Sequence, residues 1–160
     1  MKGDKKVIEH LNKALKAELT AINQYFLHSR MLGDWGVSKL AKKEYDESIE
    51  EMQHADKIIE RILFLGGLPN LQELGKLYIG EDVKEILECD MKLEDEAIPM
   101  YKDAIEICEK LRDYGTRDLL QSILNDEEEH VDFLETQFDL IKQVGIQNYI
   151  QLQSAAVTDG

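Results

Sequence analysis

The sequence has little of what disulfide-rich, collagen-like and membrane-spanning proteins require. Its 160 residues include two cysteines and two prolines, too few for a disulfide framework or a collagen repeat. No apolar run approaches the roughly 18 residues that a membrane-spanning helix needs. The residues Met1 to Asp4 also lack the apolar segment of a signal peptide. We therefore expect one cytoplasmic domain with no membrane partner.

Positive charge is scarce as well. Nineteen lysines and arginines face 33 aspartates and glutamates, which leaves a formal charge of -14 at pH 7. Such a surface repels nucleic acid and anionic membranes and attracts metal cations. We therefore expect no nucleic-acid partner. The acidic residues either bind metal or simply keep the protein in solution.

Apolar residues recur at spacings of three and four, which is the period of an amphipathic helix, and the alternation typical of strands is absent. We therefore predict an all-α fold, with Asp4 and Ser38 as helix N-caps and a kink rather than a stop at Pro99. The expected helices span about 4–33, 38–65, 82–112, 116–144 and, as a short fifth helix, 146–154.

The lengths of the connections predict the topology. Only three or four residues join the first helix to the second and the third to the fourth, so each pair is antiparallel. The crossover at about 66–81 spans roughly 50 Å when extended, enough to follow a whole helix. The second and third helices then run parallel. Residues 1–160 are therefore expected to form one ferritin-like antiparallel four-helix bundle with a long crossover.

Two Glu-x-x-His motifs stand on the expected second and fourth helices. Glu51 precedes His54, and Glu127 precedes His130, each by three residues. This spacing brings a carboxylate and an imidazole to one helix face, where they could bind one metal ion. Two solvated surface pairs would give the same pattern, so the motifs alone are weak evidence.

The spacing of two further glutamates strengthens the metal interpretation. Glu18 lies 33 residues before Glu51, and Glu94 lies 33 residues before Glu127, so the arrangement repeats with an offset of 76. The midpoint of each pair falls in or near an expected turn. Each glutamate therefore stands level with its motif across an antiparallel hairpin. Four carboxylates and two imidazoles in one layer form the di-iron carboxylate pattern.

A metal-free core would leave six ionisable groups buried without compensation. Two divalent cations would balance the four carboxylates, and this oxygen-rich, thiol-free set suits iron or manganese better than structural zinc. The symmetry suggests that Glu51 and Glu127 bridge the ions. Each remaining pair, Glu18 with His54 and Glu94 with His130, would complete one site.

Several long strings resemble the bacterioferritins. They are Glu-Leu-Thr-Ala-Ile-Asn-Gln-Tyr at 18–25, Asp-Trp-Gly at 34–36, Glu-Ser-Ile-Glu-Glu-Met-Gln-His-Ala-Asp-Lys at 47–57 and Asp-Glu-Glu-Glu-His-Val-Asp-Phe-Leu-Glu-Thr-Gln at 126–137. The resemblance implies a ferroxidase that oxidises Fe(II) with O2 or peroxide at a di-iron centre, with two irons per subunit. It also implies a hollow homo-24-mer that stores ferric mineral.

Met52 lies inside the first Glu-x-x-His motif. It stands about 100° around the helix from Glu51, so it faces away from the metal layer. A methionine there is ordinarily a packing residue. The resemblance implies instead an axial ligand of haem b, shared by two subunits, with one haem per two subunits. It also implies that a small iron-sulfur ferredoxin docks near the haem and supplies electrons for iron release.

Tyr25 lies two helical turns after Glu18, where its hydroxyl could bind a ligand carboxylate or its ring could simply pack in the core. The resemblance places a tyrosine beside the di-iron centre, which favours the first role. Tyr101 is its mate in the repeat. His10 and His28 lack a carboxylate arrangement and receive no role.

The resemblance also suggests two auxiliary sites. Some members carry a histidine and an aspartate as an inner-surface iron site where this chain has Asp46 and Glu50, so such a site here would consist of carboxylates alone. Asn148 and Gln151 match residues of a four-fold channel, although the sequence alone would make them a polar helix face.

Two other functions stay open at this point. A rubrerythrin-like peroxidase shares the bundle and the carboxylates, but its usual four-cysteine module is absent. A non-catalytic helical interaction protein would make the ligands coincidental surface charge, which the 76-residue repeat argues against.

Overall fold

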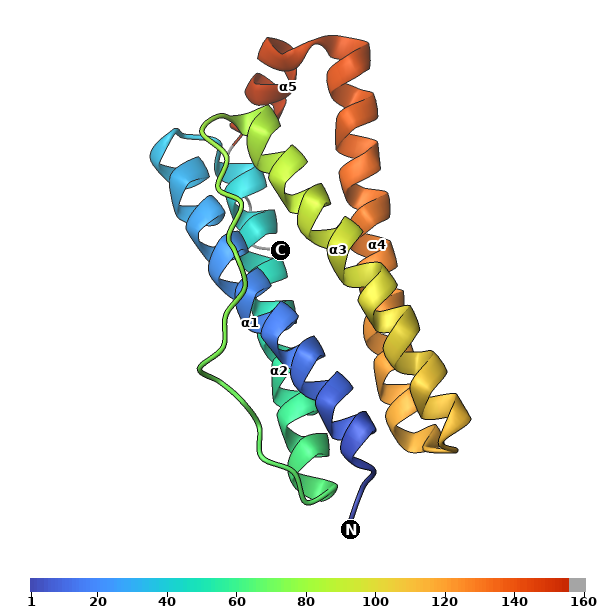
Figure 1. Ribbon diagram of the computed structural model, residues 1–160. Helices are drawn as coiled ribbons and strands as arrows, with labels where there is room; N and C mark the ends of the chain where they lie inside the picture. The colour runs from blue at the N-terminus through green and yellow to red at the C-terminus, as the bar shows by residue number, and fades with distance from the viewer. Residues whose placement is uncertain (156–160) are drawn as a thin grey trace.

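The computed structural model describes residues 1–155, and within this range it contains α-helices and no strands (Figure 1). The all-α prediction is therefore confirmed. The helices are α1 Lys5–Asp34, α2 Ser38–Phe64, α3 Val83–Lys110, α4 Tyr114–Val144 and α5 Ile146–Gln153. None of them is both long enough and apolar enough to cross a membrane.

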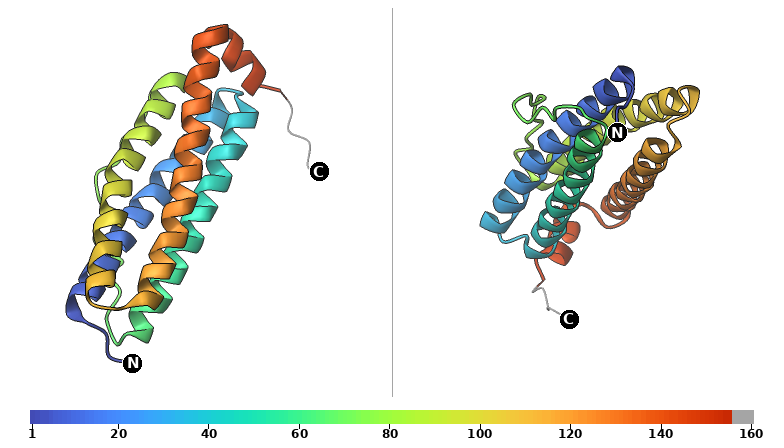
Figure 2. Two further views of the ribbon diagram at one scale, coloured as in Figure 1. Left: turned by 90° about the vertical axis from the view of Figure 1, so that its right-hand side faces the viewer. Right: turned by 90° about the horizontal axis from the view of Figure 1, so that it is seen from below.

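The four long helices form two antiparallel hairpins, α1 with α2 and α3 with α4, and α1 also packs against α3. Figures 1 and 2 show the segment between α2 and α3 running along the whole bundle, so that α2 and α3 point the same way. The short α5 lies across one end. This is the ferritin-like bundle with a long crossover that the connection lengths predict.

Local sequence sets most helix boundaries. The Asp4 carboxylate accepts a hydrogen bond from the Lys6 N–H at 2.7 Å, so Asp4 caps α1 as expected. The prediction for Ser38 was wrong, because Ser38 is the first residue of α2 and the flanking Val37 offers no side-chain cap. Val37 is buried, and its N–H donates to the Leu32 carbonyl at 2.9 Å. Packing of the turn against the core therefore fixes this start.

The start of α4 lies two residues before the expected position. The Asp113 carboxylate accepts from the Thr116 N–H at 3.0 Å, and the Arg61 guanidinium donates to Asp113 at 3.1 Å. Although burial raises the pKa of Asp113, these hydrogen bonds and the Arg61 charge lower it overall. With Asp113 as the N-cap, Tyr114 is the first residue of α4. As expected, Pro99 does not stop α3.

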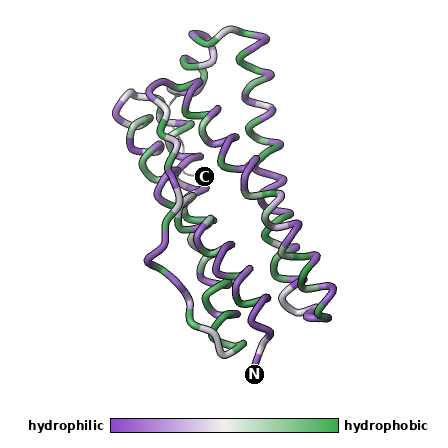
Figure 3. The backbone as a smooth tube through the Cα atoms, viewed as in Figure 1, coloured by the Kyte–Doolittle hydropathy of each residue, from purple (hydrophilic) through white to green (hydrophobic). Residues whose placement is uncertain are grey.

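The apolar interior is divided into two main clusters by a polar layer. Figure 3 shows apolar and polar residues alternating along each helix, as amphipathic helices require. One cluster lies near the α1 start and the α2 end, and includes Leu11, Leu15, Ile58, Ile62 and Leu120. The other lies near α5, and includes Leu32, Leu40, Ile86, Leu134 and Tyr149. The ligand candidates fall between them on all four helices.

The crossover is attached to α1 at every fourth residue. Since residues four apart share a helix face, one stripe of α1 provides all the attachments. The pairs are Asn12 with Leu68 and Asn70, Lys16 with Glu73, Thr20 with Gly75, Gln24 with Tyr78, and His28 with Gly80. His28, which received no role from the sequence, is fully buried and accepts the Gly80 N–H at 3.0 Å.

Gly80 offers a direct test of this attachment. A Cβ at position 80 would lie 2.3 Å from the Ile86 nitrogen. We expect Gly80→Ala to lower the free energy of unfolding by about 1–3 kcal/mol, because the backbone must move. Gly33→Ala is the matched control, since a Cβ there meets nothing within 4 Å. Urea unfolding of both variants checks this, and equal stabilities would contradict the close contact.

Candidate metal centre

The six ligand candidates meet in the layer between the two apolar clusters. Each is at most 4% exposed, so all six are withdrawn from water. They project inward from the four long helices and comprise Glu18 on α1, Glu51 and His54 on α2, Glu94 on α3, and Glu127 and His130 on α4. The repeat predicts that these residues lie at the same level along the bundle, and the structure brings all six together there.

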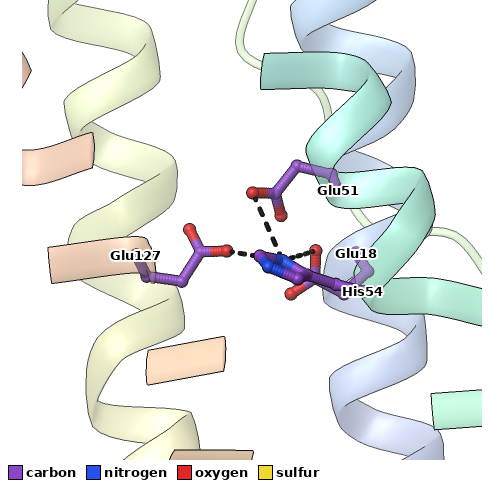
Figure 4. A group of neighbouring side chains, drawn as sticks. All are labelled: Glu18, Glu51, His54 and Glu127. Atoms are coloured by element: carbon purple, nitrogen blue, oxygen red, sulfur yellow. Dashed lines mark ion pairs between the residues drawn. The ribbon is translucent and has the colours of Figure 1, made fainter. Parts of the chain in front are cut away.

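The first group surrounds the Nδ1 atom of His54 (Figure 4). This nitrogen lies 3.5 Å from Glu18 Oε2, 3.7 Å from Glu51 Oε1 and 3.3 Å from Glu127 Oε1. Donor atoms of these four residues lie within 4.8 Å of one another. They could hold one cation between α1, α2 and α4.

The second group lies beside the first. The Nδ1 atom of His130 is 3.0 Å from Glu94 Oε1, and Glu127 completes the set. Glu127 is thus common to both groups, which suits a ligand that bridges two ions. Glu51, the other expected bridge, groups here with the His54 set.

Two buried tyrosines hold the outer glutamates. The Tyr25 hydroxyl donates to Glu94 Oε1 at 2.7 Å, and the Tyr101 hydroxyl donates to Glu18. Each tyrosine therefore serves the glutamate of the other hairpin, because α1 packs on α3. Burial raises the pKa of both phenols well above the usual value, so both remain donors.

The centre contains donor atoms that nothing else satisfies. Glu18 Oε2, Glu94 Oε2, Glu127 Oε1 and His54 Nδ1 are buried and have no hydrogen-bond partner in the described part of the chain. A buried polar atom without a partner costs roughly 1–3 kcal/mol. Cations bound among these atoms would remove that cost, so the residues fit a pair of divalent metals.

Without a cation, protons take its place. Burial and the neighbouring Glu18 raise the pKa of both Glu51 and Glu127 well above the usual value. Burial alone lowers the pKa of His54, but the nearby Glu127, Glu18 and Asp126 carboxylates raise it to about 11. Metal binding must therefore displace protons, and we expect it to tighten as the pH rises.

Asp126 is a functional residue that was not predicted from the sequence. His54 Nε2 lies 2.8 Å from Asp126 Oδ2, and a carboxylate on the far nitrogen orients a metal-binding histidine. With the Nε2 proton shared with Asp126, a metal ion displaces the proton on Nδ1, and the Nδ1 lone pair then faces the centre. The 76-residue repeat contained the signal, since Asp126 precedes Glu127 just as Glu50 precedes Glu51.

The auxiliary candidates lie outside this centre. Asp46 pairs with Lys42 at 2.9 Å, whereas Glu50 forms a cluster with His54 and Asp126. Asp46, Glu50 and Asp126 line one surface depression that reaches His54. Asn148 and Gln151 are exposed on α5. Met52 is 53% exposed and faces away from the centre, as its helical position predicts.

A cavity of about 490 Å³ reaches the centre from the opposite side. It lies between α1, α3 and the crossover, and four ligand candidates line its inner part: Glu18, Glu51, Glu94 and Glu127. Ala17, Ala21, Leu93, Ala97 and Met100 provide apolar wall. The buried carboxylates are therefore accessible to a small molecule.

This chain is similar to known proteins over most of its length. Residues 8–144 match the ferritin family, described as a ferritin-like domain. A bacterioferritin of Brucella melitensis is 57% identical, and one of Rhodobacter capsulatus 54%; both alignments cover 97% of this chain and 96% of the relative. A bacterioferritin of Mycobacterium tuberculosis is 46% identical over 93% of this chain and 94% of the relative.

Glu127 provides a test in which metal affinity should fall without a loss of stability. Loss of a residue that only supports a metal ligand typically weakens metal binding by roughly 10-fold to 100-fold. We expect Glu127→Gln, which changes a ligand candidate itself, to weaken binding of Co(II) by more than that. The metal-free variant should unfold no more easily than the parent, because one buried carboxylate has been removed. Absorbance titration with Co(II) and urea unfolding measure the two effects.

The exposed neighbour Glu128 gives the matched control. Glu128→Gln makes the same chemical change on the same helix outside the centre, so we expect binding close to that of the parent. Equal losses in both variants would show that overall charge, rather than the centre, binds the metal.

Proposed function

Because this chain belongs to the bacterioferritins, we propose that it stores iron by oxidising Fe(II) with O2 or peroxide and depositing ferric mineral inside a hollow 24-subunit shell. The observation that supports this most is the convergence of unpartnered buried donor atoms from four helices. Such an arrangement is costly unless cations bind there. In this proposal Fe(II) is the substrate, and two ions bind per subunit.

The side chains position the ions and balance their charge. Four carboxylates offset two divalent cations, while Tyr25 and Tyr101 hold Glu94 and Glu18 by hydrogen bonds. Asp126 keeps a proton of His54 on Nε2, so Nδ1 binds once its own proton is displaced. A bound pair of Fe(II) ions supplies the two electrons that the oxidant takes.

Two separate openings give the two reactants their own routes. The wall of the cavity under the crossover is apolar in part, which suits a neutral oxidant such as O2 or peroxide. The depression lined by Asp46, Glu50 and Asp126 is acidic, which suits a cation. We place Fe(II) entry or transfer to the mineral at this depression, with Asn148 and Gln151 at the four-fold channel of the shell.

Met52 is assigned to haem b, with one haem shared by two subunits. Its side chain is 53% exposed on a face of α2 that also exposes Tyr45 and Ile49, and Phe26 of α1 packs its ring 6.3 Å from Tyr45. An exposed apolar face with a thioether suits a ligand held between two symmetric copies. When bound, the haem supplies one-electron transfer.

Iron release completes the proposed cycle. A small iron-sulfur ferredoxin would deliver electrons near the haem and thereby reduce the ferric mineral. We propose that this cycle takes place in the cytoplasm.

Asp126 tests the proposed oxidation chemistry. We expect Asp126→Asn to slow Fe(II) oxidation by about 10-fold to 100-fold, because His54 loses the group that orients it. Asp132→Asn, on the exposed face of the same helix, should leave the rate unchanged. Stopped-flow absorbance of ferric iron measures both. A protein that binds Fe(II) without oxidising it would refute the ferroxidase.

Met52 tests the shell and haem together. We expect the parent to elute near 440 kDa on size exclusion, about 24 times 18.4 kDa, with a Soret band. Met52→Leu should keep the size and lose the Soret band, whereas Met91→Leu, which packs near α5, should keep both. A small colourless oligomer of the parent would refute the assembly and favour peroxidase chemistry.

A further inference from the structure

The cavity under the crossover carries positive charge that a neutral oxidant does not require. Lys13 and Lys16 of α1 and Lys76 of the crossover line it, and we call these three residues the lysine rim. Apart from the four ligand candidates, Glu96 is the one acidic residue that lines the cavity in the described part of the chain. The whole chain, by contrast, has a formal charge of -14. The lysine rim is therefore a local positive region on a strongly acidic protein.

Contacts between α1 and the crossover hold the two sides of the rim together. The Lys16 ammonium pairs with Glu73 of the crossover at 3.0 Å, which offsets part of its charge. Lys76 follows Gly75, whose N–H donates to a side chain of α1 at 2.8 Å. Lys13 and Lys76 are exposed, and neither forms an ion pair within residues 1–155. At least two of the three charges are therefore available to a molecule that enters the cavity.

The two openings of the metal centre differ in the sign of their charge. The depression lined by Asp46, Glu50 and Asp126 is acidic and attracts Fe(II). The lysine rim repels Fe(II) and attracts small anions instead. O2 and hydrogen peroxide are neutral at pH 7, so neither gains from this charge. The rim therefore indicates that one reactant of the centre is an anion.

The inner end of the cavity does not repel an anion once Fe(II) is bound. Four carboxylates line it, and two Fe(II) ions balance their four negative charges. Ala17, Ala21 and Leu93 provide apolar wall beside them. Because charges attract more strongly where apolar groups exclude water, the lysines attract an anion in the cavity more strongly than they would in open solvent.

We propose that the lysine rim steers superoxide into the cavity and that Fe(II) held at the centre reduces it. The inference rests on the proposed ferroxidase function, which supplies the bound Fe(II). Superoxide has the three required properties, since it is as small as O2, is an anion at neutral pH and takes an electron from Fe(II). The protein thereby removes superoxide in addition to storing iron.

The electrons, protons and atoms of this reaction balance. One superoxide takes one electron from one Fe(II) and two protons from solvent, which gives one hydrogen peroxide and one Fe(III). Two O–H bonds form, and the O–O bond stays intact. The hydrogen peroxide is an oxidant that the proposed function already uses. With two further Fe(II) and two protons it gives two waters and two Fe(III), so iron supplies every electron.

The dependence of the rate on salt distinguishes attraction by the rim from repulsion by the whole protein. Protein holding two Fe(II) per subunit is mixed anaerobically with superoxide in a stopped-flow instrument, and metal-free protein gives the rate of spontaneous dismutation. Raising the ionic strength from about 0.01 M to about 0.1 M shortens the screening length from roughly 30 Å to roughly 10 Å. We expect the rate constant to fall. Repulsion by the overall negative charge would make it rise, which would overturn the proposal.

Removal of two rim charges tests the lysines directly. We expect the double variant Lys13→Gln, Lys76→Gln to react with superoxide about fivefold more slowly at low salt, since steering by local charge changes association rates by about 10-fold or more. Its reaction with neutral hydrogen peroxide should equal that of the parent. The double variant Lys39→Gln, Lys84→Gln is the matched control, because it removes the same charge from exposed lysines outside this cavity. Equal superoxide rates in the two double variants would refute steering by the rim.

Azide tests the rim without any oxidation. It is a small anion, and its binding to the Co(II)-loaded protein is followed by the Co(II) absorbance. We expect Lys13→Gln, Lys76→Gln to weaken azide binding about fivefold, with Co(II) binding unchanged, because only the anion passes the rim. Equal azide affinities in this variant and in the parent would contradict the proposal.

The outcomes separate this inference from the function on which it rests. If the parent oxidises Fe(II) with O2 but removes superoxide no faster than the metal-free protein, the superoxide reaction is wrong and the ferroxidase stands. If the parent oxidises Fe(II) with neither O2 nor hydrogen peroxide, the proposed function fails and the superoxide reaction fails with it. Equal urea unfolding of the rim variant and the parent shows that the variant retains the fold.

Discussion

The structure depends on one constraint, the burial of four carboxylates and two imidazoles midway along a helical bundle. Such groups are expensive to remove from water, and several of their donor atoms have no hydrogen-bond partner among the described residues. Two apolar clusters, one on each side, provide the packing that offsets this cost. The stability of the bundle therefore comes from its two ends, and the middle is available for chemistry.

The crossover has two roles in this arrangement. It connects two parallel helices, and it is attached to α1 by side chains four residues apart, from Asn12 to His28. These attachments form one edge of the cavity that opens onto the carboxylates and hold Tyr78 near Tyr25. A segment without regular secondary structure is therefore fixed closely enough to shape access to the centre.

The two halves of the repeat are alike at the centre and different around it. Tyr25 and Tyr101 exchange partners, so each hairpin steadies the outer glutamate of the other. The histidines differ, however, because Asp126 holds His54 from the acidic depression while His130 stacks on Phe133 with ring centroids 6.3 Å apart. The six ligand candidates therefore lie in unlike surroundings, with an acidic depression beside His54 and a cavity beside Glu18, Glu51 and Glu94.

The sequence by itself determined the helices, their pairing and the six ligand candidates. Helical periodicity is local, and in an antiparallel hairpin the distance from the turn fixes the level, so Glu18 and Glu51 could be paired by counting. Only the tertiary structure decided the exchanged tyrosines, the contact of Asp126 with His54, the role of His28 and the burial of Val37 in place of a side-chain cap on α2. These features depend on how separate helices and the crossover pack together. The Tyr25–Glu94 and Tyr101–Glu18 bonds, for example, join residues 69 and 83 positions apart. A repeat fixes the height of a side chain along its helix, but the neighbour it meets depends on the rotation and packing of the helix opposite.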